Sequence, residues 1–136
     1  MLAVVNWKPH TSSPLQQSIL SNNTGGGEGG IITRITTATG LFQFYALLSS
    51  GAVSITSDVA VPQNEPVLLY GEFDRFDAAQ RLKVRVGTVQ KTAAGSAASM
   101  SSGVAPYHAI GQEKASGTTY PLAGTLSMVG IFERTL

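Results

Sequence analysis

The sequence contains no cysteine and few charged residues, and both absences exclude whole classes of protein. Without cysteine there are neither disulfide bonds nor thiolate chemistry, so packing alone must stabilise the fold. Only 12% of the 136 residues are charged, and the formal net charge is +1. No basic run is present to neutralise phosphates, which argues against nucleic-acid binding. No apolar run approaches the ~18 residues of a membrane-spanning helix, so no membrane partner is expected.

The N-terminal segment MLAVVNWKPH also lacks the features of a Sec signal peptide. Its apolar run is short, and Trp7 and Lys8 follow at once. We therefore expect a protein that is made in a cytoplasm without a Sec leader. A length of 136 residues fits a single domain, residues 1–136, that buries roughly two-thirds of the surface of its unfolded chain.

What is abundant is glycine, serine, threonine, alanine and valine, a composition that favours strands and turns. No apolar period of 3.6 residues persists for three turns, which predicts almost no helix. Short alternating segments recur about every ten residues, with Gly, Ser and Pro between them. Strands are predicted at 2–8, 18–20, 31–37, 41–48, 52–56, 67–74, 82–86, 107–111 and 122–136, with 91–105 as a long loop or loose edge. This pattern predicts an all-β fold, an antiparallel β-sandwich of jelly-roll type.

Four of these strands allow a closer prediction. Residues 41–48 are apolar on both faces, which indicates a central strand with a covered outer face. Residues 2–8 place Trp7 on an inner face with Ala3 and Val5, so Trp7 is predicted to lie in the core. The strands at 67–74 and 82–86 are expected to form a hairpin around which the rest packs. One register satisfies both of its faces, with Phe73 opposite Leu82, Glu72 opposite Lys83 and Tyr70 opposite Arg85.

Five motifs follow one another in a definite order: NWKP at 6–9, SILSN at 18–22, GEFDRFDAAQRLKVRVGTV at 71–89, AIGQ at 109–112 and PLAGTLSMVGIFERTL at 121–136. Their order and spacing resemble those of laminin-G-like domains of the concanavalin A-like superfamily. The resemblance implies a jelly roll of two antiparallel sheets that binds sugars or proteins. Ser127 and Met128 stand where that family has Asp-Glu, and 86–88 is Val-Gly-Thr where Asn-Gly is usual. No calcium motif is carried over.

The run EFDRFD at 72–77 invites an enzymatic interpretation, because glucanases of the same superfamily use carboxylates at alternating strand positions. Here the third carboxylate is Asp77, which is not Glu and falls in the predicted turn. Arg75 and Lys83 nearby favour the ionised form of a carboxylate, the opposite of what a general acid needs. No catalytic residue is therefore predicted, and the protein is expected not to be an enzyme.

Cofactor and metal sites are also not predicted. Calcium would need several oxygen-bearing loops to converge, and the candidates are Asn22, Asn23, Asp58, Asp74 and Asp77. His10 and His108 lie far apart in the sequence with no cysteine beside either, so no zinc site is indicated. The glycines at 25–30 lack the Lys-Ser/Thr of a phosphate-binding loop and are interpreted as a flexible connection.

Apolar side chains on both faces of the hairpin and of the closing strand predict surfaces that a partner covers. The alternative is a bulge in the closing strand that returns Phe132 to the core. The candidate binding residues are Leu68, Tyr70, Glu72, Lys83, Arg85, Met128 and Phe132. We expect a homo-oligomer, with a two-fold dimer favoured.

Size, missing leader and low charge together favour a structural protein of a bacteriophage virion. In format the chain resembles the jelly-roll cement proteins that decorate the capsids of some tailed phages. That hypothesis makes the capsid protein the partner and the virion the location. The alternative is a carbohydrate-binding adhesin module of a phage tail or a secreted surface protein, with a glycan as the partner.

Overall fold

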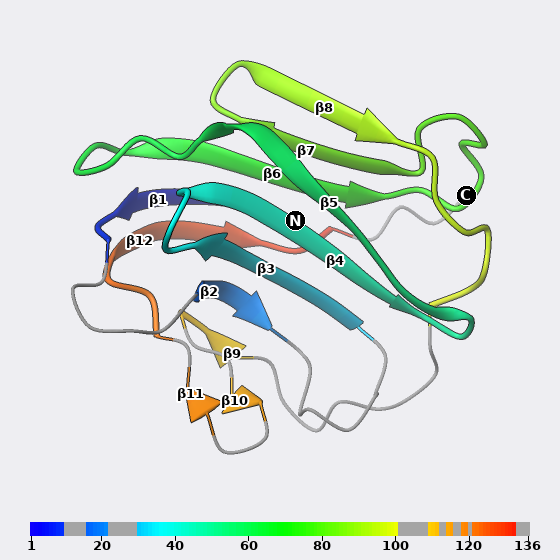
Figure 1. Cartoon of the computed structure of the whole chain (residues 1–136), viewed down its shortest axis with the longest axis horizontal. Coiled ribbons are helices and arrows are strands. Elements are labelled where there is room, and N and C mark those ends of the chain that lie inside the picture. The colour runs from blue at the N-terminus through cyan, green and yellow to red at the C-terminus, as the bar shows by residue number, and fades with distance from the viewer. Residues whose placement is uncertain are drawn as a thin grey trace.

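The computed structural model shows a protein built from strands and turns (Figure 1). It describes residues 1–9, 16–21, 30–100, 109–111, 114–115, 118–119 and 121–132. Within these ranges there is no helix, which confirms the prediction for the part of the chain described. Accordingly, none of these segments forms a helix able to cross a membrane.

Two five-stranded antiparallel sheets pack face to face. In spatial order, sheet A contains β12 (Gly124–Gly130), β1 (Leu2–Trp7), β6 (Val67–Phe73), β7 (Leu82–Val86) and β8 (Val89–Ala93). Sheet B contains β5 (Gly51–Ala60), β4 (Leu41–Leu48), β3 (Gly30–Thr36), β2 (Gln16–Ser21) and β9 (Ala109–Ile110). A small separate pair is formed by β10 (Lys114–Ala115) and β11 (Thr118–Thr119). The antiparallel sandwich is confirmed, while its jelly-roll type stays a prediction.

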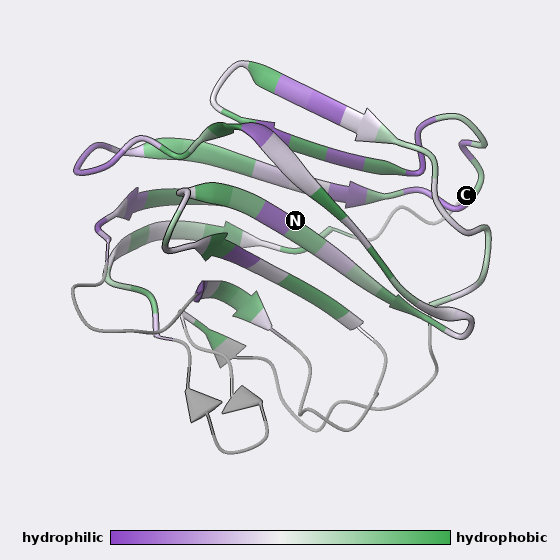
Figure 2. Ribbon diagram, in the orientation of Figure 1, coloured by the Kyte–Doolittle hydropathy of each residue, from purple (hydrophilic) through white to green (hydrophobic). Residues whose placement is uncertain are grey.

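The hairpin of β6 and β7 has the register that the sequence predicts. Phe73 pairs with Leu82, Glu72 with Lys83 and Tyr70 with Arg85. Along β7, hydrophobic and hydrophilic residues alternate, as the green and purple bands of Figure 2 show. The alternation follows from the two-residue repeat of a strand, which sends successive side chains to opposite faces.

The core lies between the sheets and is built from their inward-facing positions. Trp7, Val5 and Ala3 of β1 are fully buried, as predicted. The other large, fully buried side chains include Phe42, Phe44, Ile19, Leu20, Ile35, Leu69, Leu82 and Val84. Cysteine is absent from the whole sequence, so this apolar layer is the main stabilising element.

β4 and β6 pack tightly against each other at one glycine. The ring of Phe44 lies against the backbone of Gly71, and a Cβ at Gly71 would stand 2.3 Å from Phe44 Cδ2. Gly71 is therefore required by packing, since only a residue without a side chain leaves room for the ring. The same residue also pairs with the N-terminus: the Met1 amine donates to Gly71 O at 2.7 Å, and Gly71 N donates to Met1 O at 3.0 Å.

β4 is a central strand, as predicted, and its outer face is covered in part. β4 is interior to sheet B, but only its inward side chains are buried, and the outward ones, such as Tyr45, are half-buried. Arg34 of β3 shields part of that face, because its guanidinium lies 4.3 Å from the centre of the Tyr45 ring and donates to Gln43. A long cation covers apolar surface here in place of another element.

The loop predicted at 91–105 begins too early, because residues 91–93 belong to β8. Gly87 has a φ of +57°, which permits a two-residue turn between Val86 and Val89 and lets the chain return along β7. β8 is an edge strand of sheet A, which agrees with the loose-edge alternative for these residues. Residues 101–105 lie outside the described part.

The last two strands of the sandwich belong to different sheets. β9, within the predicted strand 107–111, joins sheet B, whereas β12, within 122–136, joins sheet A. β2 and β5 each extend beyond the predicted 18–20 and 52–56.

Candidate functional site

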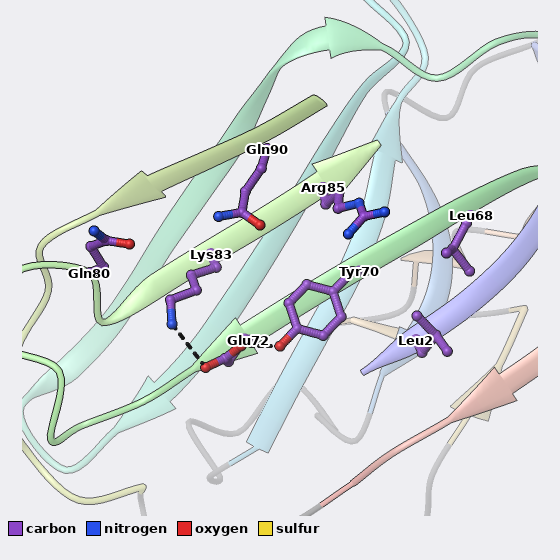
Figure 3. Close-up of a pocket in the computed structure, with 8 residues that line it drawn as sticks. All are labelled: Leu2, Leu68, Tyr70, Glu72, Gln80, Lys83, Arg85 and Gln90. Carbon is purple, nitrogen blue, oxygen red and sulfur yellow. Dashed lines mark hydrogen bonds and ion pairs between the residues drawn. The ribbon is translucent and has the colours of Figure 1, made fainter. Parts of the chain in front are cut away.

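Five of the seven candidate binding residues come together on the outer face of sheet A. Leu68, Tyr70 and Glu72 of β6 and Lys83 and Arg85 of β7 line one hollow of about 370 Å³. Leu2, Gln80 and Gln90 complete its lining. Figure 3 shows Leu2 and Leu68 at one end of this outer hollow and Gln80 at the other, with Tyr70 between them.

A small polar network occupies the centre of the outer hollow. Lys83 Nζ lies 3.2 Å from Glu72 Oε1 and 3.7 Å from Asp77 Oδ2, and the Tyr70 hydroxyl donates to Glu72. Arg85 Nε donates to the carbonyl of Gly87 at 2.7 Å. No carboxylate pairs with Arg85 in the part of the chain that the structure describes. The hollow therefore presents a guanidinium that is available to an anionic group.

The aspartates of the acidic run at 72–77 form hydrogen bonds to nearby backbone groups. Asp74 Oδ1 accepts from the backbone N–H of Phe76, and Asp77 Oδ1 accepts from those of Ala79 and Gln80. Such bonds are typical of turns that aspartate stabilises through its own side chain. Asp77 lies in the connection between β6 and β7, as predicted. These carboxylates thus have a role in shaping the loop.

The candidate metal ligands fall partly outside the described residues, which include neither Asn22 and Asn23 nor His10 and His108. Among the residues that are described, no group of three His, Cys, Asp or Glu side chains is placed to hold a metal ion. Asp58 instead forms an ion pair with Lys91, with Nζ 2.6 Å from Oδ1.

A second and more apolar hollow, of about 850 Å³, opens at the Met1 end of the sandwich. Four large apolar side chains on its rim are exposed: Phe76, Met100, Ile131 and Phe132. Phe132 and Phe76 are the most exposed, at 75% and 66%. We call these four residues the apolar mouth. They come from three separate segments, so the fold gathers them into one patch.

Sequence reasoning placed Phe132 on a contact surface, and the structure sets it in the apolar mouth. Met128, in contrast, projects from the outer face of β12 opposite Val4 and is 45% exposed, lining neither hollow. Phe76 and Met100 were missed. The signal for Phe76 was present, because an aromatic residue between Asp74 and Asp77 in a turn has no strand face through which to reach the core.

Met1 also lines the second hollow, and its α-amino group donates to Gly71 O. Burial lowers its pKa from the ordinary value of 8.0, and attraction to Glu72 offsets part of that effect.

Comparison of the chain with protein-family models, with curated proteins and with solved structures found no match. Function must therefore be inferred from the two hollows and from the sequence itself.

Proposed function

We propose that this chain is a non-enzymatic structural protein of a bacteriophage virion that decorates the capsid and cements neighbouring shell subunits. The observation that carries the proposal is the apolar mouth, in which Phe76 and Phe132 are exposed beside Met100 and Ile131 around one hollow. Large aromatic side chains grouped in this way are typical of protein-binding hot spots. The small size and low charge of the chain support the virion setting.

The apolar mouth supplies a mechanism for cementing. Phe76 and Phe132 would enter depressions on the shell, and the 850 Å³ hollow would receive an apolar group in return. Arg75 lies with its guanidinium 4.7 Å from the centre of the Phe76 ring, which holds a cation beside the apolar contact and favours an acidic rim on the partner. Because the protein would bind only the assembled shell, its binding free energy stabilises that shell by mass action.

Capsids of the encoding phage, assembled without this protein, should therefore become more resistant to heat when it is added. At a free concentration of 100 times Kd, one bound copy stabilises its site by about 2.7 kcal/mol. The measurement is the disruption temperature of capsids by light scattering across a protein titration. A disruption temperature that does not change at any protein concentration would contradict the cementing role.

A second candidate function is glycan binding through the outer hollow, as an adhesin module of a phage tail or a secreted surface protein. The observation that favours it is the lining of the outer hollow, which combines the Gln80 and Gln90 amides and the Tyr70 ring with Arg85, a guanidinium that pairs with no carboxylate among the described residues. Amides can hydrogen-bond to sugar hydroxyls, and an aromatic ring can stack on the apolar face of a sugar. A guanidinium can form charge-assisted hydrogen bonds to a carboxylate. An acidic saccharide matches this set of groups best.

Under this second function, Arg85→Gln should weaken binding of an oligosaccharide rich in uronic acid by at least about tenfold, since a charge-assisted hydrogen bond contributes about 1.5–3 kcal/mol. Binding is measured by calorimetry. Lys91→Gln is the matched control, because it removes the same charge from outside the hollow and should leave affinity unchanged. If the wild-type protein binds none of a panel of acidic and neutral oligosaccharides, glycan binding at this hollow is wrong.

A further inference from the structure

The four sheet edges of the sandwich differ in how well they are protected. β8 and β5 form the edges on one side, where the ion pair of Lys91 with Asp58 ties them together. β9 has only two residues. β12, on the remaining edge, has seven residues, GTLSMVG, with no charge and no proline, and in the described part of the chain it pairs only with β1. Exposed edges without such protection are templates for pairing with another strand.

The side chains of β12 are sorted to two faces around a bulge. Val4 pairs with Met128 and Val5 with Leu126, which leaves Ser127 as the extra residue. Leu126 and Val129 pack against the core, while Thr125 and Met128 are exposed on the outer face. Any strand that joins this edge must keep that division of faces.

We propose that two copies of this chain pair through β12, antiparallel and across a two-fold axis, so that their sheets A join into one continuous sheet. Thr125 of one copy then lies opposite Met128 of the second copy, which keeps outward side chains together on one face. The bulge does not prevent this register, because it lies at the axis. A second copy fits this edge because a two-fold axis places β12 of one copy beside β12 of the other. A charged strand would then face its own charge, and β12 carries none.

The proposed dimer does not depend on capsid binding, but a role for the dimer in cementing rests on the proposed function. β12 pairs with β1 so that Gly130 lies opposite Leu2, next to Met1 and the apolar mouth. An axis perpendicular to the sheet therefore puts the two mouths at opposite ends of the dimer. One dimer would contact two shell subunits, and linking two weak contacts raises avidity about 10²–10⁴-fold.

Introducing charges of one sign into β12 tests the dimer without capsids. The wild-type protein should sediment as a dimer over a concentration series, whereas Thr125→Lys/Met128→Lys and Thr125→Glu/Met128→Glu should each raise the dimer dissociation constant by at least about tenfold. An equal mixture of the two variants should form a heterodimer. Val89→Lys, on the opposite edge strand β8, is the control that should stay dimeric.

Two results would overturn the β12 dimer: a wild-type protein that is monomeric throughout the series, or a dimer that survives both charged pairs. Hydrogen exchange of the wild-type protein provides a check that needs no variant, because the amides of β12 should gain protection as concentration rises. Unchanged exchange there would also count against it. A protein that is monomeric alone but binds capsids through a charge-sensitive β12 would assign this edge to a strand of the shell protein instead.

Discussion

Replacing Gly71 with alanine should lower the free energy of unfolding by about 3 kcal/mol, the upper end of the usual cost of overpacking a core. The new Cβ would stand 2.3 Å from Cδ2 and 2.9 Å from Cγ of Phe44, closer than non-bonded carbons approach. Phe44 is fully buried in β4, so its ring cannot move aside without disturbing the packing of the core. The sheets must separate, or the ring must leave its rotamer. Chemical denaturation with a single unfolding transition measures the loss.

A second change separates this clash from other effects of the substitution. Phe44→Leu removes the ring edge, so the cost of Gly71→Ala should be smaller in the Phe44→Leu background than in the wild type. Gly95→Ala is the matched control, because its Cβ would meet Leu82 Cδ1 at an ordinary 3.4 Å and stability should change by less than about 0.5 kcal/mol. Additive effects of the Gly71 and Phe44 substitutions would contradict the packing described for β4 and β6.

Removing the aromatic groups of the apolar mouth should have the largest functional effect. Phe76→Ser and Phe132→Ser are each expected to weaken binding to capsids about 30-fold, which corresponds to the ~2 kcal/mol of an interface hot spot. Both side chains are exposed, so neither substitution should lower the melting temperature. Affinity is measured by cosedimentation with capsids assembled without the protein.

Val89→Ser is the control for the two mouth variants. Val89 is 46% exposed on β8, away from the apolar mouth, and capsid affinity should not change. If Phe76→Ser and Phe132→Ser bind as tightly as the wild type while the protein still decorates capsids, then another surface makes the contact. The outer hollow, with Arg85 at its lining, would be the next surface to test.

The sequence allowed the hairpin of β6 and β7 to be predicted down to its register, because both faces constrain the same pairing. The inner residues Phe73 and Leu82 and the outer pair Glu72 and Lys83 agree on one alignment. A one-residue slip would reverse the faces of the whole strand. Trp7 was placed in the core by the same alternation.

Other features depend on contacts that alternation does not encode. β8 was missed in part because Gln90 and Lys91 are polar and the strand depends on the turn at Gly87. A cover on the outer face of β4 was expected from its apolar residues, but the sequence did not show that Arg34 of the next strand supplies part of it. These outcomes depend on which strands become neighbours.

The candidate site was predictable where it lies on one hairpin. Leu68, Tyr70, Glu72, Lys83 and Arg85 share a face by strand parity, and the structure places all five around the outer hollow. The apolar mouth was not predictable as a unit, because Phe76, Met100 and Phe132 come from segments far apart in the sequence. Only the folded arrangement brings them to one end of the sandwich.

Counting bound copies on capsids by electron microscopy tests the decorating role most directly. Under the proposed function, phage capsids assembled without the protein should gain regular density when the wild-type protein is added, and the number of copies should saturate at a fixed ratio to shell subunits. The Phe76→Ser/Phe132→Ser double variant should leave the capsids bare. Capsids that stay bare with the wild-type protein, together with saturable binding to a glycan, would contradict capsid decoration and favour the adhesin.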